Sequence, residues 1–174
     1  MYTVTTSIEI AAPPATVREK FLDFPSIPKY SPEGFIRSIV PVTDKSPVDL
    51  QAGDKLNCTV GYGKMQFSPI VQENSPSLFS WVGSIPGIFT GEHAFRFEGI
   101  SSGEGQQIRT RLVHEEKFTG LLSFLMGENI LARSAGMVDD MKKKFGGFNE
   151  DFKAWVEEGA VGGSVDGGNK DGAT

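Results

Sequence analysis

Residues 90–118 read TGEHAFRFEGISSGEGQQIRTRLVHEEKF, two alternating segments on either side of a turn rich in Gly, Ser and Gln. In the second segment the charged residues Arg109, Arg111 and Lys117 stand at odd positions, whereas Leu112 and Phe118 stand at even positions. A period of two is typical of a strand with one buried face. The stretch therefore predicts an antiparallel hairpin of strands 90–98 and 108–118, joined by a turn over residues 99–107.

The alternation places both histidines of the chain on the inner face of this hairpin. A turn centred on residues 99–107 puts His93 opposite His114, and Glu116 follows His114 on the same face. The same register pairs Phe95 with Leu112 and Phe97 with Thr110. Opposite residues have Cβ atoms about 4.5–5.5 Å apart, so the two imidazoles are predicted to meet.

Further strands are predicted on the N-terminal side of the hairpin. They cover residues 3–10, 35–43, 55–62, 65–73 and 79–83, each bounded by Gly, Pro, Asn or Ser. Residues 61–64, GYGK, predict a tight turn between two of them. Strands so closely spaced indicate antiparallel pairing, because a parallel pair needs a crossover of about a dozen residues or more.

Helices are predicted after the first strand and at the C-terminal end. Residues 15–24 favour a short amphipathic helix, and a second short helix or turn follows around Ile27 and Tyr30. A long helical stripe is formed by Ile130, Met137, Met141, Phe145, Phe148, Phe152 and Trp155. Because this stripe keeps its phase across Gly146 and Gly147, we expect a bend or a close contact at the two glycines rather than two separate helices.

The 174 residues are predicted to form one α+β domain over residues 1–158. Residues 159–174, GAVGGSVDGGNKDGAT, have no apolar period, so we expect a disordered Gly-rich tail. The net charge of −5 and the absence of a concentrated basic face argue against nucleic acid as a partner.

The compartment is expected to be cytoplasmic. The single cysteine, Cys58, cannot form an intramolecular disulfide and alternates with its neighbours as a small buried strand residue would. No signal-peptide pattern is visible at the N-terminus. No apolar run approaches the roughly 18 residues that predict a membrane span.

The order of these elements resembles the START-like (SRPBCC) superfamily. The likeness is carried by residues 8–10 (IEI), 12–13 (AP), Val17, 21–23 (FLD), 79–81 (FSW), 90–97 (TGEHAFRF) and 114–120 (HEEKFTG). The last two segments look like a polyketide cyclase and dehydrase-like branch. The resemblance implies a helix-grip fold, in which a curved antiparallel sheet of about seven strands wraps a long C-terminal helix around an apolar cavity.

Three interpretations of His93, His114 and Glu116 stay open. They satisfy buried hydrogen bonds, or they transfer protons as catalytic groups, or they contribute to a metal site. No further ligand stands at a zinc-like spacing, so neither a metal nor another cofactor is predicted. Residues 120–127, GLLSFLMG, are either a lid over the cavity or the first turn of the last helix.

The leading hypothesis for function is the binding of a small hydrophobic or aromatic molecule, polyketide-like or lipid-like, inside the cavity. The residues predicted to line the cavity are Trp81, Phe95, Phe97, Leu112, Phe118, Met137 and Met141. One alternative is a cyclase, dehydratase or isomerase that uses the two histidines and Glu116. Another is an interaction module whose cavity is filled by its own side chains. The oligomeric state is not predicted.

Overall fold

A computed structural model describes residues 1–61, 65–85, 89–101, 107–119 and 137–162 of the chain. The strands are β1 (Tyr2–Ile10), β2 (Ile36–Pro41), β3 (Leu56–Val60), β4 (Met65–Phe67), β5 (Ile70–Ser75), β6 (Leu78–Ile85), β7 (Phe89–Ile100) and β8 (Arg109–Thr119). The helices are α1 (Pro14–Leu22), α2 (Ile27–Tyr30) and α4 (Met137–Gly162), with short 3₁₀ turns at Phe24–Ser26 and Pro47–Asp49.

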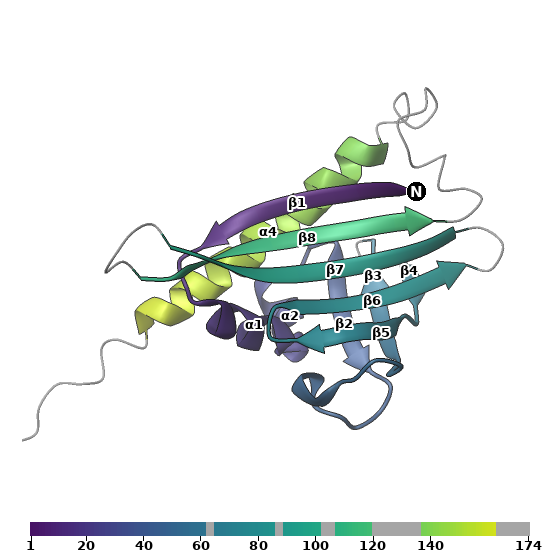
Figure 1. Cartoon of the computed structure of the whole chain (residues 1–174), viewed down its shortest axis with the longest axis horizontal. Coiled ribbons are helices and arrows are strands. Elements are labelled where there is room, and N and C mark those ends of the chain that lie inside the picture. Colours follow the sequence, from purple (N-terminus) through teal and green to yellow (C-terminus); the bar gives the residue numbers. More distant parts are fainter. Residues whose placement is uncertain (62–64, 86–88, 102–106, 120–136, 163–174) are drawn as a thin grey trace, which may run out of the picture.

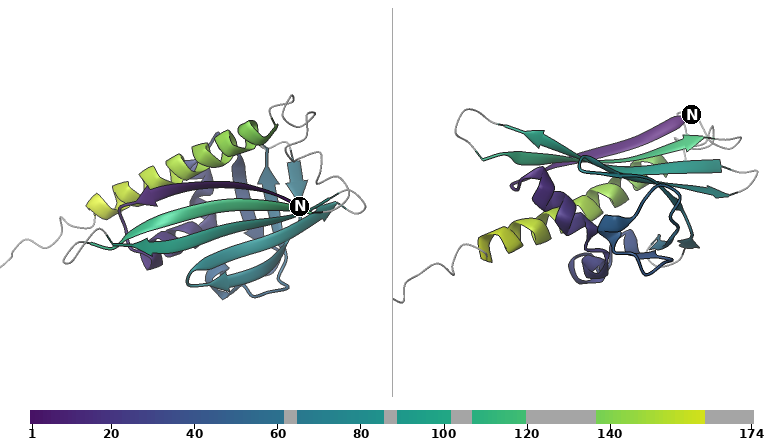
Figure 2. Two further views of the ribbon diagram at one scale, coloured as in Figure 1. Left: turned by 45° about the horizontal axis from the view of Figure 1, so that its top comes forward. Right: turned by 60° about the horizontal axis from the view of Figure 1, so that its bottom comes forward.

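The strands form two antiparallel sheets, one in the order β1-β8-β7-β6-β5 and one in the order β2-β3-β4. The five-stranded sheet curves along α4, which runs beside β1 (Figure 1). The helices and the smaller sheet lie on the same side of the larger sheet (Figure 2). The α+β helix-grip architecture predicted from the sequence is therefore confirmed.

One predicted strand, residues 65–73, is two strands in the structure, which raises the strand count from seven to eight. β4 pairs with β3, whereas β5 pairs with β6 in the other sheet. The break falls at Ser68 and Pro69, where proline has no N–H to continue a ladder. The carbonyl oxygen of Pro69 instead accepts a hydrogen bond from the backbone N–H of Leu56 at 3.0 Å, which joins the two sheets.

The β7–β8 register differs from the predicted one by two residues. His93 lies opposite Glu116, and His114 lies opposite Phe95. Phe97 pairs with Leu112 rather than with Thr110. A shift of two keeps every side chain on its predicted face, because side chains alternate with a period of two. Alternation determines only the sheet face on which a side chain lies. The register also depends on the length of the turn, and no residue in the turn requires a particular turn type.

The predicted stripe on α4 is buried as expected. Phe145, Phe148 and Phe152 have exposed fractions of 0%. The helix continues without a break through Gly146 and Gly147, but a Cβ built on either glycine meets no atom of a neighbouring element within 4 Å in the described chain. The prediction of one helix rather than two is therefore confirmed, whereas the close contact, one of its two predicted alternatives, is not found among the described residues. Ile130, residues 62–64 of the predicted turn and the predicted lid at 120–127 lie outside the described residues.

The helix also extends to Gly162, four residues beyond the predicted end of the domain. Residues 163–174 lie outside the described part of the chain. The Gly-rich tail therefore stays a prediction for that segment.

A cluster of aromatic side chains fills the space between the larger sheet and the helices. Phe21 of α1 lies at its centre, with ring centroids 4.4 Å from Phe95, 5.7 Å from Phe79 and 6.1 Å from Phe152. Aromatic pairs at such separations add about 0.5–1.5 kcal/mol each beyond their buried area. This packing fixes the helices against the sheet below the region that holds the site.

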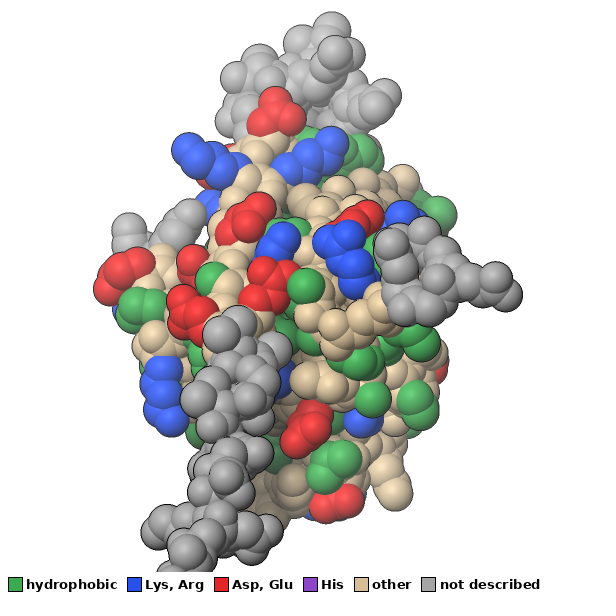
Figure 3. Space-filling model, turned by 90° about the vertical axis from the view of Figure 1, so that its left-hand side faces the viewer, with side chains coloured by type: hydrophobic (Ala, Val, Ile, Leu, Met, Phe, Trp, Pro, Cys, Tyr) green, Lys and Arg blue, Asp and Glu red, His purple; other side chains and the backbone are tan. Residues whose placement is uncertain are grey.

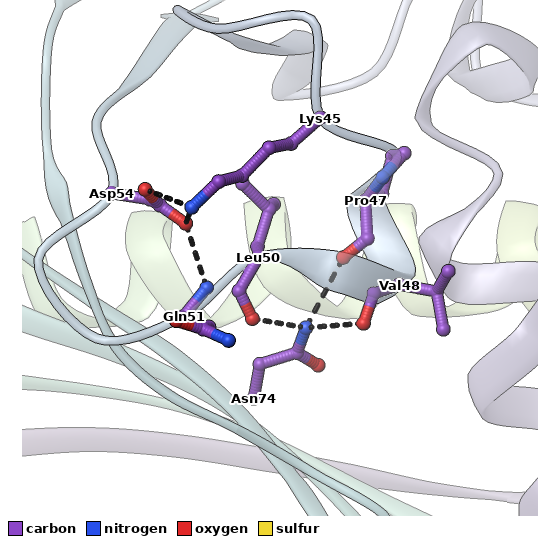
Figure 4. Close-up of polar contacts among 7 residues, drawn as sticks. All are labelled: Lys45, Pro47, Val48, Leu50, Gln51, Asp54 and Asn74. Atoms are coloured by element: carbon purple, nitrogen blue, oxygen red, sulfur yellow. Dashed lines mark hydrogen bonds and ion pairs between the residues drawn. The ribbon is translucent and has the colours of Figure 1, made fainter.

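The connection from β2 to β3 is held by the side-chain amide of Asn74 on β5 (Figure 4). The Nδ2 atom of Asn74 faces the carbonyl oxygens of Pro47, Val48 and Leu50 at 3.1, 3.3 and 3.0 Å. Its Oδ1 atom accepts a hydrogen bond of 2.6 Å from Arg18 on α1. Asn74 thereby ties the loop that precedes β3 to both the larger sheet and the first helix.

Cys58 is buried with an exposed fraction of 2%, as predicted from its place in an alternating strand. Burial raises the pKa of its thiol to about 12. A thiol with so high a pKa carries almost no thiolate at neutral pH, so Cys58 has a packing role rather than a nucleophilic one.

Charged side chains of both signs are interspersed on the face drawn in Figure 3, and no histidine is visible there. Both histidines are buried. None of the helices in the described ranges is long and apolar enough to cross a membrane.

Candidate functional site

A pocket of about 270 Å³ lies between the inner faces of the two sheets and the first turns of α4. Its lining is mainly apolar and comes from five strands, the segment before β2 and the last helix: Phe35, Val60, Met65, Phe67, Trp81, Gly83, Ser84, Gly91, His93, Glu116, Phe118, Met141 and Lys144. Among the lining residues, Met65 is exposed and Phe118 is buried.

Cross-strand rows of the larger sheet explain which predicted residues reach the pocket. One row is Trp81, His93 and Glu116, and all three line the pocket. Phe118 in the neighbouring row also lines it, as does Met141 from α4.

The next rows toward α1 belong to the core rather than to the pocket. Phe95, Phe97 and Leu112 are at most 3% exposed and pack in the main hydrophobic cluster. The side chain of Met137 lies outside the described part of the structure. The predicted ligand-binding residues thus divide into those that line the pocket and those that only pack in the core, although the ones on strands share one face of the sheet.

Two glycines make room for the pocket on the inner face of the sheet. Gly83 and Gly91 are cross-strand partners on β6 and β7, so this point of the sheet carries no side chain. A Cβ on Gly83 would come within 3.2 Å of the ring of Phe67, and one on Gly91 would come within 2.8 Å of Oε1 of Glu116. Glycine is therefore required at position 91 for the carboxyl group of Glu116 to lie where it does.

His93 and His114 are diagonal neighbours on β7 and β8, and their Nε2 atoms are 2.6 Å apart. Their meeting was predicted, but through a different register. Each ring is held by an aromatic neighbour. The His93 ring stacks on Trp81 at 4.8 Å and 13°, and the His114 ring stacks on Phe145 at 4.2 Å and 16°.

Asn149 on α4 decides which nitrogen of His114 carries the proton. The Nδ2 group of Asn149 donates to the hydroxyl oxygen of Thr6 on β1 at 3.1 Å, which leaves Oδ1 to face Nδ1 of His114 at 2.9 Å. An amide oxygen only accepts, so His114 is protonated on Nδ1 and presents a bare Nε2 atom.

The tautomer of His93 follows from that of His114. Because Nε2 of His114 is bare, Nε2 of His93 must be the donor in the 2.6 Å contact. Nδ1 of His93 then faces Oε2 of Glu116 at 3.4 Å. This distance is within the range of an ion pair when His93 is protonated on Nδ1.

The site is therefore one linear network that begins at the pocket with Glu116 and passes through His93, His114 and Asn149 to Thr6. Asn149 and Thr6 were not among the site residues predicted from the sequence. A signal for Asn149 was present, since it stands one helical turn after Phe145 and beside Phe148 in an otherwise apolar stripe. The exposed fraction of Asn149 is 1%, and a buried side-chain amide needs hydrogen-bonding partners.

Residues 1–157 match the family described as polyketide cyclase / dehydrase and lipid transport. The chain belongs to this family. The predicted resemblance to the START-like superfamily and its polyketide cyclase branch is thereby confirmed. No protein with a curated description matches the chain.

Solved structures of the same fold agree with the family assignment. The aromatase/cyclase Zhui from a Streptomyces species is 12% identical, with a TM-score of 0.63 over 97% of this chain and 99% of that chain. A protein from Thermus thermophilus is 14% identical, with a TM-score of 0.62 over 94% and 100% of the two chains. Norcoclaurine synthase from Thalictrum flavum, solved with dopamine and hydroxybenzaldehyde, is 10% identical, with a TM-score of 0.59 over 90% and 87%. At these identities the likeness establishes the fold alone.

Within this family fold, the electrostatics of the site favour neutral His114. Complete burial lowers the pKa of His114 well below 6.5, and the neighbouring His93 lowers it further, whereas the contact with Asn149 acts in the opposite direction. A neutral His114 agrees with the tautomer that Asn149 imposes.

A metal-binding role for the two histidines has no support in the geometry. Across the described ranges, no three side chains of His, Cys, Asp or Glu are arranged to hold a metal ion. The Nε2 atoms of His93 and His114 point at each other at 2.6 Å, a distance that leaves no space for an ion between them.

Proposed function

We propose that this protein binds a small planar aromatic or apolar molecule in the pocket beside Trp81 and Glu116. The observation that carries the proposal is the pocket itself, about 270 Å³ in volume and lined mainly by apolar side chains. An apolar cavity of roughly 150 Å³ holds a benzene molecule, and pockets for drug-sized ligands begin near about 300 Å³. A ligand of one or two rings is therefore the expected size.

Stacking surfaces favour a planar ligand. Trp81 and His93 form a nearly parallel pair on the pocket wall, and Phe118 and Phe35 contribute two further rings. Rings prefer offset-stacked or edge-to-face contacts, which a flat ligand can make with several walls at once. The alternative hypothesis of an interaction module with a filled cavity is less well supported, because the bare backbone at Gly83 and Gly91 leaves space that side chains do not fill.

Titration calorimetry with naphthalene tests this proposal. We expect saturable binding at one site and a rise in the melting temperature with ligand concentration, since a ligand that binds only the folded state stabilises it by mass action. Gly83→Val should weaken binding at least tenfold, because the added methyl groups enter the pocket beside Phe67. Gly99→Val on the same sheet is the matched control, since an added Cβ there meets, among the described residues, Pro14 at 3.5 Å and Ile108 at 3.8 Å. Absence of binding to the unmodified protein would refute the proposal.

A second candidate function is proton transfer, as in a cyclase, dehydratase or isomerase. It is favoured by the network from Glu116 through His93 and His114, which reaches the pocket at a carboxyl group. In this role, the carboxylate of Glu116 accepts a proton from a carbon next to a ligand carbonyl. The C–H bond breaks, an O–H bond forms and the electron pair moves into an enolate. His93, held by His114, stabilises the charge on Glu116 when its Nδ1 atom is protonated.

Deuterium exchange at the α-carbons of 2-tetralone, a two-ring ketone, measures this activity in D₂O by NMR. The protein should accelerate exchange, and Glu116→Gln should abolish the acceleration while the protein remains folded. Glu115→Gln is the control, because Glu115 lies on the opposite face of β8, where it contacts Thr5 and Arg96. Equal exchange rates with the unmodified protein and with Glu116→Gln would exclude the catalytic role.

A further inference from the structure

We infer that Glu116 selects ligands that carry a hydroxyl group, so that the pocket prefers hydroxylated aromatic molecules to hydrocarbons of the same shape. This inference rests on the proposed ligand binding and deepens it. Its basis is the position and hydrogen-bonding state of one atom, Oε1 of Glu116. The two oxygens of this carboxyl group have different surroundings: Oε2 faces His93, whereas Oε1 lies over the bare backbone of Gly91.

Oε1 is an acceptor whether or not Glu116 carries a proton on Oε2. If this proton is absent, Glu116 is a carboxylate and both its oxygens accept. If the proton is on Oε2, that oxygen donates to Nδ1 of His93 and Oε1 is the carbonyl oxygen. The conclusion therefore does not depend on where the proton lies.

No donor in the described ranges of the chain reaches Oε1. The contact of Glu116 with a polar side chain is the one through Oε2, and its side chain is 18% exposed on the pocket wall. Lys144, the other charged residue of the lining, pairs with Asp140 one helical turn away. A ligand with an O–H group satisfies Oε1, whereas a hydrocarbon would cover it and leave a polar atom without a partner, which is costly.

A neutral donor fits better than a cation. Lys144 on the pocket wall would repel an ammonium group. A phenol-like hydroxyl group provides the hydrogen bond without this cost, and its ring meets Trp81 and Phe118.

Comparison of 2-naphthol with 2-methylnaphthalene tests the inference by calorimetry. The two molecules have nearly the same shape, and hydrophobic transfer alone favours the methyl compound. We expect 2-naphthol to bind at least tenfold more tightly, the usual effect of a hydrogen bond to a charged or strongly polar group. In Glu116→Met the order should reverse, whereas Glu115→Met on the outer face should leave it unchanged.

Three outcomes would overturn the inference. If 2-methylnaphthalene binds at least as tightly as 2-naphthol to the unmodified protein, Glu116 does not select hydroxyl groups, although ligand binding stands. If Glu116→Met keeps the preference, the hydroxyl group bonds elsewhere. If neither compound nor naphthalene binds, the proposed function itself fails and the selection by Glu116 falls with it.

Discussion

Replacing Phe152 by alanine should lower the free energy of unfolding by about 3–5 kcal/mol. Phe152 is 0% exposed and lies at the centre of α4, with ring contacts to Phe21 of α1, Tyr30 of α2 and its own helix neighbour Phe148. Alanine would leave a cavity between three elements. These elements are also joined by other rings, so they cannot collapse onto the space without losing those contacts.

Urea denaturation monitored by circular dichroism measures this loss. Val48→Ala is the control, because it also removes apolar atoms but from a side chain that is 56% exposed. The control should change stability by no more than about 0.5 kcal/mol. A loss for Phe152→Ala as small as that of the control would mean that the predicted phase of the C-terminal helix is wrong.

Acid should destabilise the protein through His114 before most carboxyl groups titrate. The pKa of His114 in the folded state is lowered well below 6.5 by burial and by His93. In the unfolded chain the pKa of this histidine is about 6.5. Between that value and the lower pKa of the folded state, the unfolded chain binds a proton that the folded chain does not. The contribution of His114 to stability is therefore complete above pH 6.5 and falls as the pH falls. The slope for one such group is about 1.4 kcal/mol per pH unit.

The comparison of the unmodified protein with His114→Gln isolates this effect. Urea unfolding at pH 8 gives the cost of the substitution, and the difference between the two proteins should then shrink steadily between pH 6.5 and pH 4.5. The titratable group that faces His114 is His93 on β7, while α4 and β1 present Asn149, Phe145 and Thr6, which do not titrate in this range. Parallel stability curves for the two proteins would show that His114 is not held neutral.

The sequence by itself determined the architecture and the faces of its elements. Alternation from Thr90 to Phe118 placed His93, His114 and Glu116 on one inner face, and the spacing of Phe145, Phe148 and Phe152 gave the buried stripe of the last helix. Such patterns are reliable because the period of each element is fixed by backbone geometry, and burial then selects the apolar side. The resemblance of short segments to a known superfamily was sufficient for the fold, but not for the chemistry of the site.

Tertiary structure alone decided the register of the strands and the contacts between elements distant in the sequence. The register of β7 and β8 could not be read from alternation, which is unchanged by a shift of two residues, so the contact between Glu116 and His93 was not predicted. Trp81 and Phe97 both pack in the main hydrophobic cluster, but only Trp81 lines the pocket, a difference that strand alternation does not show. Asn149, 35 positions from His114 in the sequence, sets the tautomer of that histidine through a contact that only the packing of α4 on the sheet creates. Local patterns specify which way a side chain points, whereas its partner is fixed by the packing of elements distant in the sequence.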